Sequence, residues 1–382
     1  MVRCTVAHVS LAALKANFRT ITDYVIGVAR LSGARPPGLI AVIKANAYGH
    51  GAPRVGLALE EAGATMLACA DIEEGIALRQ AGVGTGILVF GALSVSDVGG
   101  LFEYDLTPTI STPGAGEALQ RAAAARDTRL RYHLKIDTGM NRLGFRHDNL
   151  ARTMPAILGS PNLELAAVFT HFATSGDPDD GLFEIQRRRF DEALGQLARL
   201  GWPHVPRHAA NSAALVRHPG AWFDFVRPGI LLYGVVPPAF RRVLPLSPVM
   251  TLRSRVVAVK GVRVGESVGY GARFVAGRPT TIAIVPAGYA DGLDARLAGR
   301  GSVLVAGRRA PIIGSVCMDM ITIDVTDIRV ETGDEVVLLG AQGDDRIDVQ
   351  EMADAIGTIP YEILCRVGTR IERVYNSEPY SK

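Results

Sequence analysis

The stretch Ala41-Val-Ile-Lys-Ala-Asn-Ala-Tyr-Gly-His-Gly51 sets a lysine directly after a short apolar run. The run Leu39–Ile43 has the length and bulk that are typical of a buried strand in a parallel sheet. A lysine at the end of such a strand is badly placed for solvent and well placed to meet a carbonyl ligand. Burial or a nearby cation would lower its pKa and leave a nucleophilic amine. Taken alone, Lys44 is better explained as a strand-end cation that reaches solvent.

Seven further apolar runs follow, and helical patterns such as Ile72–Ala81 and Leu182–Leu200 lie between them. Ser10 is a suitable N-cap for an amphipathic helix that begins at Leu11. Eight short buried strands that alternate with helices predict an α/β fold with a closed (β/α)8 barrel. An open doubly wound sheet is the alternative, but no GxGxxG motif opens the first βα turn. The expected strands are Leu39–Ile43, Met66–Ala70, Ile87–Phe90, Leu106–Ile110, Leu130–Ile136, Leu165–Thr170, Val205–Ala209 and Phe225–Gly229.

The pattern changes after about residue 240, where β-rich segments alternate with Gly-containing turns and helical patterns are scarce until Val349–Ile356. We therefore expect a barrel over residues 1–240 and a mainly β domain over residues 241–382. A proline-rich stretch at 236–248 is the expected linker. The expected β segments are Arg255–Val259, Thr281–Val285, Ser302–Val305, Met320–Val325 and Glu335–Leu339.

The composition is that of an ordinary globular protein, since 48% of the 382 residues are hydrophobic and 21% are charged. The formal net charge of +3 is too small to indicate a nucleic-acid or anionic-membrane partner. The four cysteines lack a metal-binding spacing, no apolar run is long enough to cross a bilayer, and no secretory signal opens the sequence. We expect free thiols, no metal, and a cytoplasmic protein with no nucleic-acid or membrane partner.

Polar groups follow four of the other expected strands, at the barrel end where active sites lie. Strand five leads into Lys135 and Arg142, strand six into His171, strand seven into Asn211-Ser212 and strand eight into Arg227-Pro-Gly-Ile230. The last two loops lie where barrels often bind phosphate. Each group also has a simpler explanation: Asn211-Ser212 as a helix cap, His171 as a buried imidazole, Arg142 as half of an ion pair. Five strand ends together nevertheless offer what one phosphorylated ligand needs.

Lys44-Ala-Asn-Ala-Tyr-Gly-His-Gly51 resembles the cofactor-binding signature of the alanine racemases. This family holds pyridoxal 5'-phosphate (PLP) on a lysine as a Schiff base. The resemblance continues along essentially the whole chain. It is carried further by His133-Leu-Lys-Ile-Asp-Thr-Gly-Met-Asn-Arg-Leu-Gly144, Thr170-His-Phe172, Asn211-Ser212, Val226-Arg-Pro-Gly-Ile230, Gly269-Tyr-Gly271, Gly288-Tyr-Ala-Asp-Gly292, Ser315-Val-Cys-Met-Asp319 and Ile359-Pro-Tyr-Glu-Ile363.

The resemblance implies a homodimer, packed head to tail, in which the partner completes each active site. It implies that Lys44 is the Schiff-base lysine and one of two bases, and that Tyr270 of the partner subunit is the other. Arg142 and the main chain of the partner's Met318 would hold the substrate carboxylate. Lys135 corresponds to a lysine that is carbamylated in many members and then braces Arg142.

The resemblance also assigns the remaining contacts. Those to the cofactor phosphate fall to Tyr48, Ser212, Gly229, Ile230 and Tyr361, with Asn211 beside them. Arg227 would face the pyridine nitrogen, and His171 would lie beside the ring and Arg227. Tyr289 and Tyr361 would line the passage by which substrate reaches the site.

The chemistry is consistent with these roles. Racemisation requires that a proton leaves one face of the α-carbon and returns on the other, so two bases must flank the cofactor. A lysine and a tyrosine meet this need without a metal, provided that positive neighbours make the phenol more acidic than usual. A carboxylate at the pyridine nitrogen would make the ring a strong electron sink, whereas an arginine carries only donors. Arg227 therefore disfavours transamination as a side reaction.

Two positions depart from the family pattern. Asn141 stands where the family usually has glycine, beside Arg142. The family often has an arginine six residues after the tyrosine of Gly-Tyr-Ala-Asp-Gly, and here Ala295 has that spacing while Arg296 comes one later. Neither position touches the two bases, so both bear on rate and selectivity rather than on reaction type.

The expected activity is the interconversion of L- and D-alanine, which supplies D-alanine for peptidoglycan or degrades it. One alternative is a racemase of similar construction that prefers serine or a wider range of amino acids. A PLP-dependent decarboxylase with two such domains is another, but it needs a Gly-rich phosphate loop late in the barrel, which is missing here. A non-enzymatic PLP-carrying protein would resemble a lone barrel.

Overall fold

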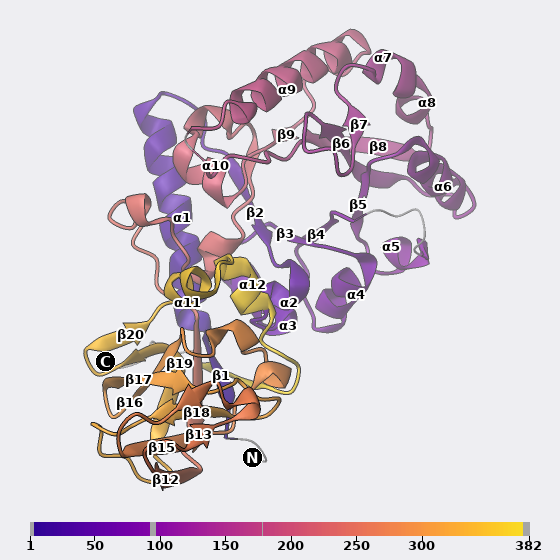
Figure 1. Cartoon of the computed structure of the whole chain (residues 1–382). Coiled ribbons are helices and arrows are strands. Elements are labelled where there is room, and N and C mark those ends of the chain that lie inside the picture. The colour runs from indigo at the N-terminus through magenta and orange to yellow at the C-terminus, as the bar shows by residue number, and fades with distance from the viewer. Residues whose placement is uncertain (1–3, 92–96, 178, 377–382) are drawn as a thin grey trace.

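The structure, a computed structural model, describes residues 4–91, 97–177 and 179–376 and contains a barrel and a β domain (Figure 1). The outer ends of the two expected domain ranges, residues 1–3 and 377–382, lie outside the described residues. The barrel strands follow the order β5-β4-β3-β2-β10-β9-β8-β6, and β6 pairs with β5 to close the ring. Every pairing round the ring is parallel. The predicted (β/α)8 barrel is confirmed.

All eight predicted strands are present. They are β2 (Gly38–Val42), β3 (Met66–Cys69), β4 (Gly86–Val89), β5 (Thr107–Ile110), β6 (Leu130–Asp137), β8 (Leu163–Phe169), β9 (Arg207–His208) and β10 (Phe225–Val226), with β7 (Phe145–Arg146) beside β6. Strands β9 and β10 are much shorter than predicted. Pro206 and Pro228 flank them, and a proline has no backbone N–H to extend the ladder.

The helices begin where side chains can cap them. The Ser10 hydroxyl accepts a hydrogen bond from the Ala13 amide at 3.1 Å, which starts α1 (Leu11–Leu31) at the predicted residue. The helices α4 (Ile72–Gln80) and α9 (Leu182–Arg199) end one residue before their predicted ends. The other helices that connect barrel strands are α2 (Lys44–Tyr48), α3 (Ala52–Glu61), α5 (Gly99–Glu103), α6 (Pro113–Ala124), α7 (Leu150–Thr153), α8 (Pro155–Leu158) and α10 (Ser212–Arg217).

The β domain is built on a sheet of order β12-β15-β18-β17-β16-β19-β11-β1-β21, in which β20 also pairs with β19. Its strands are β1 (Val6–Ser10), β11 (Met250–Arg255), β12 (Ala258–Val262), β15 (Thr280–Val285), β16 (Ser302–Val305), β17 (Arg308–Ile313), β18 (Ile321–Asp324), β19 (Glu335–Gln342), β20 (Asp345–Ile347) and β21 (Glu372–Asn376), with a separate hairpin of β13 (Ser267–Val268) and β14 (Phe274–Val275). The helices α11 (Val349–Ile356) and α12 (Pro360–Cys365) return towards the barrel (Figure 1).

Two features of the β domain differ from the sequence analysis. The segment Arg255–Val259 is not one strand, because β11 ends at Arg255 and β12 begins at Ala258. The N-terminal strand β1 pairs antiparallel with β11 and parallel with β21, so the chain starts in the sheet of the β domain before α1 enters the barrel.

The junction between the barrel and the β domain is packed and hydrogen-bonded. The Asn17 side chain on α1 donates to the carbonyls of Leu232 and Ser247 at 3.0 and 2.8 Å and accepts from the Ser247 amide at 2.9 Å. These bonds fasten the proline-rich linker to the longest barrel helix. A continuous apolar core extends from the barrel through this junction into the β domain.

Within the described residues, no helix is both long and apolar enough to span a membrane. In the same part of the chain, no three His, Cys, Asp or Glu side chains gather in a way that could hold a metal ion.

Candidate active site

A cavity of about 280 Å³ lies at the carboxyl ends of the barrel strands. It receives side chains from loops that are far apart in the sequence but adjacent around the barrel. Its walls are formed by Val42, Lys44, Tyr48, Ala70, Phe90, Gly91, Lys135, Arg142, Leu143, Phe169, His171, Asn211, Ser212, Arg227, Gly229 and Tyr361. The structure thus brings together most of the site residues that the sequence indicated.

Lys44 reaches this cavity from an unusual turn. Strand β2 ends at Val42, one residue earlier than expected, and the four residues after Lys44 are all left-handed: Ala45, Asn46, Ala47 and Tyr48 have φ of 53°, 52°, 56° and 53°. The Ala47 amide donates to the Ile43 carbonyl at 2.8 Å, as in a helical turn of opposite hand. A left-handed helical conformation costs an L-residue roughly 1–2 kcal/mol. Neighbouring parts of the fold must therefore hold the turn in place.

The glycines of the same motif show part of that support. Gly49 has φ of 81°, and a Cβ built on it would come within 2.2 Å of the Leu364 carbonyl oxygen in α12. A Cβ on Gly51 would collide with the Tyr375 hydroxyl of β21. Only glycine allows both the left-handed backbone and this close packing against the β domain.

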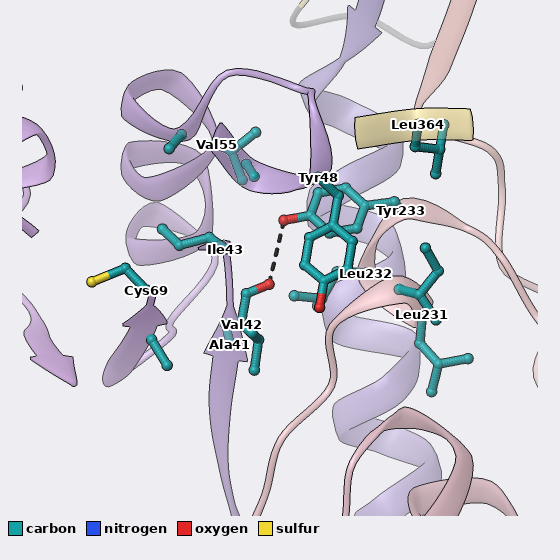
Figure 2. Close-up of a cluster of buried hydrophobic side chains, with 14 of the residues drawn as sticks. Ala41, Val42, Ile43, Tyr48, Val55, Cys69, Leu231, Leu232, Tyr233 and Leu364 are labelled. Carbon is teal, nitrogen blue, oxygen red and sulfur yellow. Dashed lines mark hydrogen bonds between the residues drawn. The ribbon is translucent and has the colours of Figure 1, made fainter. Parts of the chain in front are cut away.

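Tyr48 lines the cavity and belongs to a cluster of buried side chains that includes Tyr233 (Figure 2). Its ring centroid is 4.9 Å from that of Tyr233 and 5.9 Å from that of Tyr361 on α12. The Tyr233 hydroxyl donates to the Val42 carbonyl at 3.4 Å, which ties the cluster to the end of β2 (Figure 2). Burial raises the pKa of Tyr48, so its hydroxyl keeps the proton and can donate it to an anion.

Arg227 is buried in the wall of the cavity and is held by four hydrogen bonds. Its guanidinium donates to the carbonyls of Thr170 and Ala209 at 2.9 and 2.8 Å, to His208 Nδ1 at 2.8 Å and to His171 Nδ1 at 3.2 Å. Burial lowers the pKa of Arg227 to about 9, so the group stays charged near neutral pH.

The bonds of Arg227 determine the tautomers of the two histidines. Because a guanidinium only donates, both Nδ1 atoms must be acceptors, and His171 and His208 carry their proton on Nε2. His208 Nε2 then donates to His133 Nδ1, which lies 3.0 Å away. Burial first, then Arg227, keeps the pKa of His171 and His208 well below the usual range, so the chain of imidazoles is neutral.

Four cationic groups surround the cavity: Lys44, Lys135, Arg142 and Arg227. Burial, then Arg142 and Arg227, lowers the pKa of Lys135 to about 8. Burial, then Arg142, also lowers the pKa of Lys44. Each amine therefore has a larger neutral fraction than an exposed lysine, and the cavity favours an anionic ligand.

The loops after β9 and β10 meet beside Tyr48. The Gly229 amide donates to the Ser212 hydroxyl oxygen at 2.8 Å. Asn211 lines the cavity, and its side-chain oxygen caps α10 by accepting from the Ala214 amide at 2.9 Å. The simpler explanation of Asn211 as a helix cap therefore holds. Ile230, which is buried at the start of a 3₁₀ turn, is not among the residues that form the cavity wall.

Besides Ile230, three more predicted site residues are absent from the wall of the chain's own cavity. Tyr270, Tyr289 and Met318 belong to the β domain and are 78%, 49% and 53% exposed. Hydrogen bonds join the other two to the segment that carries Met318. The Ser315 hydroxyl donates to the Tyr270 carbonyl at 2.7 Å, and the Tyr289 amide donates to the Cys317 carbonyl at 3.0 Å. They therefore form a separate exposed cluster.

The two departures from the family pattern have simple structural consequences. Asn141 has φ of 53°, a conformation that glycine adopts freely and that asparagine tolerates better than most residues. The backbone beside Arg142 thus keeps a conformation suited to glycine. Arg296 forms ion pairs with Asp294 and Glu362, and Glu362 belongs to the helix that carries Tyr361. Arg296 consequently braces that helix.

Three further residues, His208, Phe169 and Glu74, were not among the predicted site residues. His208 links Arg227 to His133, Phe169 stacks on His208 at 4.6 Å between centroids, and Glu74 contacts the Lys44 turn. For His208, a signal was present: its strand ends beside Asn211-Ser212, so a polar side chain there faces the same end of the barrel.

A closed barrel with a lysine, a buried arginine and a cluster of cations at its strand ends, joined to a β domain, defines a two-domain barrel enzyme with its site at the carboxyl ends of the strands. Residues 9–237 match the family profile of the alanine racemase N-terminal domain, and residues 249–375 match that of the C-terminal domain. The chain belongs to the alanine racemase family.

Individual relatives agree with this assignment over nearly the full chain. An alanine racemase of Carboxydothermus hydrogenoformans is 44% identical over 97% of this chain and 98% of its own length, and one of Symbiobacterium thermophilum is 40% identical over 98% of both. Among solved structures, alanine racemase from Streptomyces lavendulae has a TM-score of 0.92 at 34% identity, covering 99% of this chain and 98% of that one. Alanine racemase from Bacillus anthracis, solved with bound L-Ala-P, has a TM-score of 0.90 at 35% identity, covering 99% and 97%.

Proposed function

We propose that this enzyme interconverts L- and D-alanine with PLP as its cofactor, by a two-base mechanism, and supplies D-alanine for peptidoglycan. The observation that carries the proposal is the meeting of Lys44, Arg142 and Arg227 at one cavity in a chain of the alanine racemase family. The names of the relatives support alanine as the substrate.

The residues around the cavity fit PLP. Lys44 offers an amine with a lowered pKa for the aldehyde carbon, and Tyr48 offers a protonated hydroxyl for the phosphate. Gly229 leaves room beside that hydroxyl, since a Cβ there would come within 2.4 Å of it. Ser212 and Tyr361 complete this side of the cavity, with Ile230 packed behind. When bound, PLP supplies the electron-withdrawing group that makes the α-hydrogen of an amino acid acidic.

Arg227 faces the ring end of the proposed site. Its guanidinium carries hydrogen-bond donors only, and its hydrogen bonds to His171 and His208 hold it in one orientation. It would therefore leave a pyridine nitrogen without a proton, which favours racemisation over transamination.

Two bases exchange the proton in the proposed mechanism. Lys44 Nζ removes or returns it on one face of the α-carbon. The chain's own Tyr270 is exposed on the β domain and does not line its own cavity. We therefore assign the second base to Tyr270 of the partner subunit in a head-to-tail homodimer with shared sites. Tyr289 and Tyr361 would line the access passage between the subunits.

The substrate carboxylate would bind to Arg142, which lines the cavity, and to the main chain of the partner's Met318. Lys135 lines the same cavity as Arg142, and burial, then Arg142, lowers the pKa of its amine to about 8. Its neutral amine can add to carbon dioxide and release a proton, which would convert this cation into a carbamate anion that braces Arg142.

In this proposal, residues 1–240 contain the cofactor-binding barrel, although strand β1 (Val6–Ser10) lies in the sheet of the β domain. Residues 241–382 form the domain that completes the partner's site. Since peptidoglycan precursors are made inside the cell, it also implies a cytoplasmic enzyme. A preference for serine is the main alternative, because the family assignment does not fix the substrate side chain.

Chiral chromatography of L-alanine and of D-alanine, each incubated with purified protein and PLP, tests the proposal. Both should approach the same racemic mixture, and kcat/KM for alanine should exceed that for serine and for lysine. Lys44→Ala should lose the covalent adduct that borohydride fixes on residue 44 of the wild-type protein. A higher kcat/KM for serine, or release of carbon dioxide without inversion, would overturn the proposal.

A further inference from the structure

Glu74 joins the Lys44 turn to the neighbouring barrel strand. It lies in the first turn of α4, where the Asp71 side chain caps its amide at 2.8 Å. One carboxylate oxygen of Glu74 accepts a hydrogen bond from the main-chain N–H of Asn46 at 3.1 Å. The other accepts from the main-chain N–H of Ala70 at 2.8 Å. Asn46 lies in the left-handed turn, and Ala70 follows β3. A single carboxylate therefore bridges two strand ends of the barrel.

The bridged amides are ones that need a partner. The first amides of a helical turn, whatever its hand, have no carbonyl acceptor within the turn. Glu74 accepts from one of them, at Asn46. The Asn46 side chain in turn accepts from the Ala52 amide at 2.8 Å, at the start of α3. The left-handed turn is thus fastened at its entrance by Glu74 and at its exit by Asn46.

We propose that Glu74 is a positioning residue for Lys44: its carboxylate holds the left-handed turn against the end of β3 and so fixes the direction in which Lys44 Nζ enters the cavity. This inference rests on the proposed function of Lys44 as the cofactor lysine and catalytic base. The backbone torsions set that direction, because Lys44 is the residue immediately before the first left-handed position.

The charges around Lys44 give Glu74 a second effect. The titratable groups that interact with Lys44 come from the barrel and from α12. They are Glu74 of α4, Lys135 of β6, Arg142 of the loop after β6, His171 of the loop after β8, Arg227 of the loop after β10 and Cys365 of α12. Burial first, then Arg142, lowers the pKa of Lys44, while Glu74 raises it. Removal of the Glu74 charge should therefore lower that pKa further.

The test compares three variants of the full-length protein with the wild type. Glu74→Gln removes the charge and replaces one acceptor with a donor. Glu74→Asp keeps the charge but is too short to reach both amides. Glu73→Gln is the matched control, because Glu73 is exposed in the same turn of α4. The readouts are amide hydrogen exchange of a peptide spanning residues 44–52, the pH dependence of Lys44 acetylation by acetic anhydride in PLP-free protein, and kcat and KM for alanine.

Exchange over residues 44–52 should rise in both Glu74 variants. The acetylation midpoint of Lys44 should move to lower pH in Glu74→Gln and stay near the wild-type value in Glu74→Asp. The kcat should fall roughly 10- to 100-fold with a smaller change in KM, as expected when a reacting group is displaced by about 1 Å. Glu73→Gln should match the wild type in all three readouts.

Wild-type exchange, acetylation midpoint and kcat in both Glu74 variants would overturn the inference. A loss of stability with a wild-type acetylation midpoint and a wild-type kcat would show that Glu74 has a purely structural role. That result would also overturn the inference. If Glu74→Gln does not fold, Glu74→Asp decides the question through exchange and kcat. Failure of the proposed function looks different, since the wild-type protein itself would then lack the PLP adduct on Lys44.

Discussion

Gly229 lies so close to Tyr48 that a Cβ built on Gly229 would stand 2.4 Å from the Tyr48 hydroxyl oxygen. The two residues are far apart in the sequence of the barrel domain. The parallel pairing of β10 with β2 brings them together. The contact confines the hydroxyl to one position beside the cavity. If that hydroxyl binds the cofactor phosphate, the absence of a side chain at 229 is a requirement for binding.

Gly229→Ala should therefore weaken PLP binding about tenfold or more, because overpacking a filled site typically costs 1–3 kcal/mol. Spectroscopic titration of PLP-free protein measures the affinity. Gly277→Ala is the control, since no heavy atom lies within 4 Å of a Cβ built there. Equal PLP affinity in Gly229→Ala and the wild type would remove Tyr48 and Gly229 from the phosphate site.

Lys135 should be carbamylated in a pH-dependent way. Burial, then Arg142 and Arg227, lowers the pKa of its amine to about 8. Only the neutral amine adds to carbon dioxide, so the carbamate should increase as pH rises through about 8 and be scarce below about 7. Carbon-13 NMR of protein equilibrated with labelled bicarbonate detects it, and Lys135→Gln is the control. A spectrum that is the same with and without Lys135 across this range would contradict the expectation.

Asp294 should stabilise the helix that carries Tyr361. Hydrogen bonds from Arg296, then the charge of Arg366, hold the pKa of Asp294 at about 2. A depressed carboxyl pKa contributes stability that is present above the unfolded value near 4 and is lost as pH falls through about 2. Asp294→Asn should lower the free energy of unfolding by about 1–2 kcal/mol at pH 7, with both arginines partly screened by solvent.

The difference between wild type and Asp294→Asn should shrink as the pH falls from 4 towards 2. Urea unfolding at several pH values measures it, with Asp191→Asn on the exposed face of α9 as the control. A difference that is constant with pH would show that Asp294 does not act through its charge.

Much of the fold was predictable because most barrel strands, such as β2, β3 and β4, are short apolar runs that are largely buried. The site followed from one rule, that polar groups at the carboxyl ends of barrel strands converge, which placed Lys44, Lys135, Arg142, His171 and Arg227 correctly at one cavity. Strands β9 and β10 are shorter than predicted, because Pro206 and Pro228 beside them have no backbone N–H to donate to a neighbouring strand.

Two features could not be predicted from local patterns. Alanine favours the right-handed helix, so nothing in Ala45–Ala47 indicates a left-handed turn. Contacts from α4 and α12, both distant in sequence, decide it. Likewise, β1 pairs with β11 and β21, which lie more than 200 residues later in the chain, and no local periodicity specifies such partners.

Each active site of the proposed dimer uses Lys44 of one chain and Tyr270 of the partner subunit. Co-expression of Lys44→Ala and Tyr270→Phe chains with different affinity tags allows the mixed dimer to be purified. Each parent homodimer should be inactive, whereas the mixed dimer has one site with both bases and should show about half the wild-type turnover per dimer. Chiral chromatography in both directions measures it. A mixed dimer as inactive as its parents would contradict the shared site, and near-full turnover of the Tyr270→Phe homodimer would remove Tyr270 as a base.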